Sequence, residues 1–229
     1  MDLHERASSL AENLVSNGIG KRPLVIVCHS LGGLLAKEIF RACCETRDKD
    51  WKALGDQLKL MVFFATPHKG SSLSAILKAL IPRISSPLVD SISNESGYLT
   101  NLNSSYRDLA MERDLTSVAY YEKYKTKNMA LVVSAESADP GCTQTRPIPI
   151  DSDHIEICKP NNKEATAYLS LRRHIAKILE ACPASREGEL GGDMGPDDYS
   201  VPSKEDRRTL LEKLIDANRE HEYSHANSL

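Results

Sequence analysis

The 229-residue chain lacks the long apolar segments and the leader that mark membrane and secreted proteins. Its longest apolar runs, residues 23–28 and 60–65, are far shorter than the roughly 20 residues needed to cross a bilayer. No positive-then-apolar leader follows Met1. We therefore expect no transmembrane segment and no secretion, with peripheral membrane association still open.

The chain also lacks the patterns typical of disulfide scaffolds, metal sites and nucleic-acid-binding proteins. None of its six cysteines has C-x-x-C spacing, and a domain of this length does not need disulfides, so we expect reduced thiols. The histidines are scattered and no cysteine lies at ligand spacing, which predicts neither a metal nor a cofactor. The net charge is −3 with both signs interspersed, so no broad positive field is available for nucleic acid.

The first third of the chain alternates segments of helical and strand type. Residues 2–17 carry apolar side chains at helical spacing, and Leu24–Val27 form a continuous run typical of a strand buried on both faces of a parallel sheet. A helical pattern from Leu31 to Ala42 precedes a second buried strand at Lys59–Phe64. This order predicts a strand, helix, strand crossover of right hand.

Further strands are expected at residues 118–121 and 130–134, and further helices at 72–80, 97–112 and 164–181. The alternation predicts an α/β fold with a doubly wound, mostly parallel sheet over residues 1–182. Residues 183–204 are rich in Gly, Pro, Asp and Glu and are expected to be a flexible linker. Residues 205–229 carry an amphipathic helix that we expect to dock on a neighbour or a protein partner.

The segment from Cys28 to Gly32 (CHSLG) matches G-x-S-x-G with cysteine at its first position. In that motif a strand turns sharply into a helix and holds the serine in a strained backbone, so the positions two before and two after need small side chains. The motif makes Ser30 the candidate nucleophile and the backbone N–H of Leu31 a candidate oxyanion donor. The simpler alternative is a serine that caps a helix.

Residues 65–71 (ATPHKGS), taken with CHSLGG, resemble the G-[TA]-P-H-x-G-S segment of lipase-like α/β-hydrolases. The stretches LVVSAESADPG and IPIDSDHIEICKP resemble the serine active site-containing proteins associated with phospholipid remodelling at mitochondria and the endoplasmic reticulum. The chain is also similar to lipase-like modules of fungal and plant nucleotide-binding regulatory proteins. The resemblance covers residues 2–182 and implies an α/β-hydrolase, cytoplasmic or peripheral on those organelles.

A serine nucleophile needs a general base and a carboxylate that fixes the base. His154 lies in a polar loop and matches the D-H-x-x-x-C-K ending of the relatives, so the resemblance implies that it is the base. Glu136 matches their E-S-A segment and is the preferred acid. Glu122 is the alternative, because a strand count places the acid at the end of the VAYYE strand and Glu122 also matches an acidic position of the relatives; Asp139 is third. An ordinary exposed carboxylate is the simpler interpretation of each.

Two other histidines have expected supporting roles. His29 follows the nucleophile strand and is expected to pack there, and His68 is expected to brace the sheet edge near the site, with a structural role as open as a catalytic one. Residues 73–89 occupy the place where lipases often carry a lid.

In the relatives a strand and a His-Gly oxyanion loop precede the first helix, and the chain as given does not contain them. We therefore expect an N-terminally truncated fold with an open strand edge and without the second oxyanion donor, a loss that costs on the order of 100- to 1,000-fold in turnover. Two functions follow. The first is a serine esterase or lipase that cleaves a lipid or acyl ester through an acyl-enzyme on Ser30. The alternative is an impaired or inactive module that acts in protein interaction or regulation.

Overall fold

The computed structural model describes residues 2–69, 96–126, 133–142 and 146–181. The chain divides into two units, residues 1–175 and 176–229, and the described part of the second is only the end of the last helix. The helices are α1 (Leu3–Ser16), α2 (Gly32–Glu45), α3 (Lys49–Gln57), α6 (Ser96–Glu112) and α7 (Thr166–Ala181), with a 3-10 turn η2 (Glu156–Cys158). The strands are β1 (Leu24–His29), β2 (Leu58–Phe64), β3 (Thr116–Glu122) and β4 (Ile148–Ile150).

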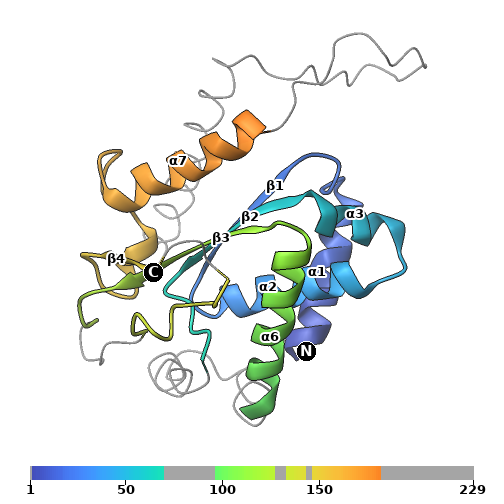
Figure 1. Ribbon diagram of the computed structural model, residues 1–229, viewed down its shortest axis with the longest axis horizontal. Coiled ribbons are helices and arrows are strands. Elements are labelled where there is room, and N and C mark those ends of the chain that lie inside the picture. Colours follow the sequence, from blue (N-terminus) through green and yellow to red (C-terminus); the bar gives the residue numbers. More distant parts are fainter. Residues whose placement is uncertain (1, 70–95, 127–132, 143–145, 182–229) are drawn as a thin grey trace, which may run out of the picture. The chain divides into compact units, whose positions relative to one another are not determined.

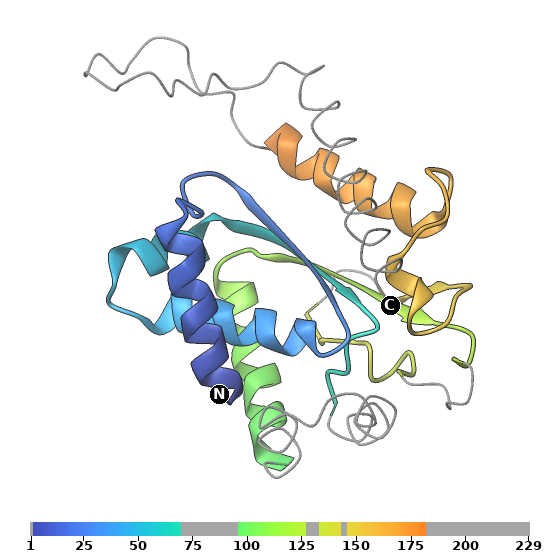
Figure 2. The ribbon, with the colours of Figure 1, turned by 180° about the vertical axis from the view of Figure 1, so that it is seen from behind.

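The four strands form one parallel sheet in the order β1-β2-β3-β4. Parallel neighbours need a crossover, and α2 with α3 connects β1 to β2 (Figures 1 and 2). The predicted α/β fold with a parallel sheet is confirmed. All carboxyl ends of the strands therefore lie at the same edge of the sheet.

Helices cover both faces of the sheet. On one face, Phe63 and Ala119 pack in a buried cluster with Phe40 of α2 and Tyr106 of α6. On the other face, Phe64 stacks on Tyr120, whose hydroxyl donates a hydrogen bond to Ser170 of α7 at 2.8 Å. Burial of apolar side chains in both layers stabilises the fold, by roughly 25 cal/mol per Å² of surface removed from water.

The position of β1 differs from the expectation. The run Leu24–Val27 predicted burial on both faces, but within the described residues β1 pairs only with β2 and lies at the end of the sheet. Val27 is accordingly 47% exposed, whereas every residue of β2 except Lys59 is buried. An apolar run does not distinguish a central strand from an edge strand, so the prediction of two buried faces is wrong.

Most other elements match their predicted ranges, and two short ones were missed. The helices expected at 2–17, 97–112 and 164–181 correspond to α1, α6 and α7, and the strand at 118–121 lies within β3. Helix α3 and the three-residue strand β4 were not predicted. The helix at 72–80, the lid at 73–89 and everything after 182 lie outside the described residues. So does most of the strand at 130–134, and residues 133 and 134 are not in a strand.

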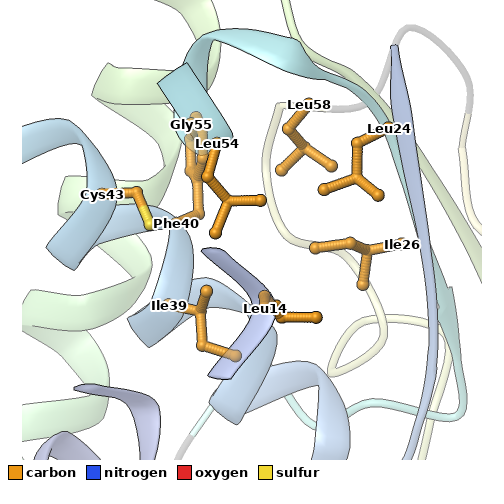
Figure 3. A pocket seen from close by; sticks show the side chains of 9 residues that line it. All are labelled: Leu14, Leu24, Ile26, Ile39, Phe40, Cys43, Leu54, Gly55 and Leu58. Carbon is orange, nitrogen blue, oxygen red and sulfur yellow. The ribbon is translucent and has the colours of Figure 1, made fainter. Parts of the chain in front are cut away.

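A small apolar pocket of about 10 Å³ lies beside β1, where side chains of α1, α2, α3 and the strands meet (Figure 3). Its nine lining residues are Leu14, Leu24, Ile26, Ile39, Phe40, Cys43, Leu54, Gly55 and Leu58. This volume holds at most one water, and none of the candidate site residues lines the pocket. It is a packing gap and not a substrate site. None of the helices within the described ranges is long and apolar enough to cross a membrane.

Candidate active site

Ser30 lies between the end of β1 and the start of α2 and has the strained backbone that its motif predicts. Its φ angle is +52°, in the left-handed region that residues other than glycine rarely adopt. Its N–H donates to the carbonyl of Phe64 at 2.9 Å, which fixes the turn against the end of β2. Such strain is maintained only when the surrounding structure determines it, as it does here.

The close approach of α2 to the sheet occurs at Gly33. A Cβ at Gly33 would lie closer than 3 Å to the side chain of Thr66, whereas a Cβ at Gly32 would meet nothing within 4 Å. The expected need for a small residue two positions after the serine is therefore wrong by one position. On the other side of the serine, the buried Cys28 thiol fits by donating to the Val62 carbonyl at 3.0 Å. Burial raises the pKa of Cys28 to about 12, so this thiol stays protonated.

The structure brings His154 to Ser30. The Nε2 atom of His154 lies 3.0 Å from the Ser30 Oγ, and the two residues are only 2% and 7% exposed. The backbone N–H of His154 donates to the Thr126 Oγ1 at 3.2 Å, and its carbonyl accepts from the Nε2 of His29 at 2.7 Å. These two bonds hold the histidine loop in place at the carboxyl edge of the sheet.

The carboxylate next to His154 is Glu122, the last residue of β3. Its Oε1 lies 3.6 Å from the His154 Nδ1, and its side chain is fully buried. The same Oε1 accepts the backbone N–H of Val133 at 2.6 Å. The separation of 3.6 Å is slightly longer than a hydrogen bond. Catalytic hydrogen bonds are often this long in sites without substrate and shorten when substrate binds.

The structure does not bring the preferred acid, Glu136, to the histidine. The Glu136 side chain is 83% exposed and its Oε1 accepts a hydrogen bond from Lys69 at 2.8 Å, an interaction that lowers the pKa of Glu136. Asp139, the third candidate, accepts the backbone N–H of Gly141 at 2.8 Å within a turn. Both residues match acidic positions of the relatives; the strand end had indicated Glu122, and the E-S-A segment had slightly favoured Glu136. The preference of Glu136 over Glu122 is therefore not supported by the geometry.

His29 and His68 lie in different surroundings. The His29 ring is 5.0 Å from that of His154, and burial together with that neighbour lowers the pKa of His29. His68 is buried away from this pair, with its Nδ1 2.7 Å from the Nζ of Lys37 and its ring edge-on to Phe63. His29 thus contacts the candidate base directly, whereas His68 joins α2 to the segment after β2.

Lys37 was missed by the sequence analysis although it is only 1% exposed. It lies three residues after Leu34 and three before Phe40, both buried, so its spacing alone places it on the inward stripe of α2. Burial lowers the pKa of Lys37 to about 7. No group of three or more potential metal ligands gathers in the described part of the chain.

The comparisons with known proteins agree with the predicted resemblance. No family model matches the chain, and no solved structure is significantly similar. Protein SERAC1 of Danio rerio is 31% identical over 182 residues, and that of Homo sapiens is 29% identical over 187, in both cases covering 76% of this chain. The alignments span only 27% and 28% of those proteins. The similarity to serine active site-containing proteins is therefore confirmed for about three quarters of the chain and about a quarter of theirs.

Proposed function

We propose that this chain is the hydrolase core of a serine esterase related to Protein SERAC1, in which Ser30, His154 and Glu122 form the catalytic triad. The observation that carries the proposal is the distance of 3.0 Å between the Ser30 Oγ and the His154 Nε2, at a left-handed elbow between a strand and a helix. Three residues of the required types, from three distant segments, are adjacent at one edge of the sheet.

In this mechanism the Ser30 Oγ attacks the ester carbonyl carbon while its proton passes to the His154 Nε2. The resulting imidazolium lies beside the buried Glu122 carboxylate, which stabilises its charge. The tetrahedral intermediate collapses, and the alcohol leaves with the proton from His154. Water then attacks the acyl-serine, with His154 as the base, and releases the carboxylic acid.

The backbone N–H of Leu31 is the proposed oxyanion donor. It follows the nucleophile at the start of α2, and no hydrogen-bond acceptor occupies it within the described residues. The positive end of the α2 dipole adds to its effect on the developing negative charge. One further donor is needed for full turnover, because a single missing donor costs on the order of 100- to 1,000-fold.

The substrate class follows from the resemblance and not from a pocket. We infer an ester of a lipid or another acyl ester, with the protein cytoplasmic or peripheral on mitochondria or the endoplasmic reticulum and with no cofactor. The tail after residue 182 would serve as a contact for a protein partner. The second candidate function, an inactive interaction module, is favoured by one observation, that Leu31 is the one oxyanion donor identified among the described residues.

A fluorophosphonate probe distinguishes the two functions because it reacts only with a serine activated by its base. We expect labelling of the folded wild-type chain and none of Ser30→Ala or His154→Ala. Circular dichroism of all three proteins controls for folding. A folded wild-type protein that stays unlabelled at high probe concentration would exclude the esterase and leave the interaction module.

A further inference from the structure

A buried lysine lies in the core between α2 and α6, and none of its hydrogen-bonding partners in the described part of the chain is a carboxylate. The Nζ of Lys37 donates to the Asn103 Oδ1 at 2.6 Å and contacts the His68 Nδ1 at 2.7 Å. It also lies 4.6 Å from the centre of the Tyr106 ring and 5.3 Å from that of Phe63. Both hydrogen-bonding partners are neutral groups, and burying a cation without a paired anion costs free energy. Stability alone therefore does not explain why a lysine stands at this position.

The lysine determines how His68 is held. Burial and the nearby Lys37 ammonium lower the pKa of His68 well below its usual value, so the imidazole stays neutral. When Lys37 is protonated, its ammonium group can only donate, so the His68 Nδ1 accepts the hydrogen bond and the ring proton lies on Nε2. With the ring of His68 also packed edge-on against Phe63, the segment after β2 is fixed in one position.

The same segment is tied to the turn formed by residues 133–138, here called the acid-facing turn. The backbone N–H of His68 donates to the Ser137 carbonyl at 2.8 Å, and Lys69 pairs with Glu136. The turn is closed by the N–H of Ala138, which donates to the Ser134 carbonyl at 2.9 Å. The turn is thus anchored at the buried Ser137 through His68 and at the neighbouring, exposed Glu136 through an ion pair.

The first residue of the acid-facing turn contacts the proposed triad acid. The N–H of Val133, which is fully buried, donates to the Glu122 Oε1 at 2.6 Å, and that oxygen is the one that faces the His154 Nδ1. A continuous series of contacts therefore leads from Lys37 through His68 and the turn to Glu122. None of its members before Glu122 reaches Ser30 or His154 in the described structure.

We propose that Lys37 is a positioning residue for the hydrolysis reaction, acting through His68 to hold the acid-facing turn so that Val133 fixes the Glu122 carboxylate against His154. This inference rests on the proposed function, because it assigns the role of acid to Glu122. Without the lysine, His68 loses its anchor and the turn can shift relative to the end of β3. A misplacement of about 1 Å at a catalytic group can cost on the order of 100-fold in rate.

The test compares Lys37→Met with Tyr106→Phe. Methionine keeps the apolar stem and removes the ammonium. Tyr106→Phe removes a buried hydrogen bond to the Ser117 Oγ, 2.6 Å in length, from the same core while keeping the ring. The readout is the second-order rate constant for fluorophosphonate labelling of the full chain. We expect a 10- to 100-fold decrease for Lys37→Met and a change of less than threefold for Tyr106→Phe.

A rate for Lys37→Met within threefold of wild type, or an equal loss in Tyr106→Phe, would overturn the proposal. If Lys37→Met does not fold, Lys69→Met takes its place in the test. Lys69 is partly exposed, and its replacement removes the ion pair with Glu136 that holds the same turn. We expect a severalfold slower labelling for that variant, and a wild-type rate would count against the role of the turn.

A second readout does not depend on activity. In Ser30→Ala protein, the Nδ1 proton of His154 should give a low-field NMR signal if it faces Glu122. We expect the signal to shift or disappear when Lys37→Met is added and to stay when Tyr106→Phe is added. If the wild-type chain is never labelled, the proposed function fails, and this spectrum still decides whether Lys37 positions the Glu122 and His154 pair. An unshifted signal would refute the positioning role.

Discussion

Exchanging the carboxylate of Glu122 for an amide is expected to remove most of the esterase activity. At an effective dielectric constant of about 20, unit charges separated by the observed 3.6 Å interact by about 5 kcal/mol. Glu122→Gln loses this stabilisation of the imidazolium in the transition state, which corresponds to about three to four orders of magnitude in rate. The steady-state kcat on a p-nitrophenyl ester and the rate of fluorophosphonate labelling should both fall by that factor.

Glu136→Gln is the matched control because it makes the same chemical change in the residue that the motif comparison favoured. Its side chain is 83% exposed and the glutamine oxygen can still accept from Lys69, so we expect less than a tenfold decrease. Circular dichroism should show both variants folded. The reverse order of effects, with Glu136→Gln the more damaging, would refute the assignment of Glu122, and small effects in both would refute a carboxylate-assisted base.

Three further predictions concern stability, each measured by urea unfolding of the full chain. Gly33→Ala should lower the free energy of unfolding by about 2–3 kcal/mol, because the added Cβ would overlap the Thr66 side chain. Gly32→Ala should change it by less than about 1 kcal/mol, because its Cβ would meet nothing. Equal losses would contradict the close approach of α2 at Gly33. Ala65 is buried with a φ of +47°, a strained angle that glycine adopts without strain. Ala65→Gly should therefore lower the free energy of unfolding by about 1–2 kcal/mol less than Ala119→Gly, the same change at a buried alanine in β3. Equal losses would argue against strain after β2. The folded-state pKa of Lys37, about 7, is lower than its usual value of 10.5, so between these values the unfolded chain binds more protons and stability rises with pH. Between pH 7 and 9 the wild type should therefore gain about 1 kcal/mol per pH unit relative to Lys37→Met, and parallel curves would show that the buried lysine keeps an ordinary pKa.

The sequence predicted the elements whose patterns are local. Strand β2 is a run of apolar residues bounded by turns, and the elbow at Ser30 follows from a short motif between a strand and a helix. His154 was the candidate base because its segment resembles the D-H-x-x-x-C-K ending of the relatives. These features depend on neighbours in the chain, which the sequence displays directly.

Features set by contacts between distant segments could not be predicted in the same way. The choice between Glu122 and Glu136 depends on which carboxylate lies next to His154, and the contact of 3.6 Å to Glu122 and the bond from Val133 to Glu122 are set by segments distant in the sequence. The exposure of β1 depends on which strands pair with it. Lys37 is the exception, because its spacing on α2 was enough to place it on the inward stripe.

The parallel sheet separates the partners of the Ser30 and His154 contact by 124 positions along the chain. Contacts of such long range form late in folding, because the chain must lose the entropy of closing a long loop before these contacts add stability. Refolding chains should therefore recover helical circular dichroism before they recover reactivity toward a serine-directed probe. A lag between these signals would make chemical reactivity of the serine a kinetic marker for completion of the sheet edge.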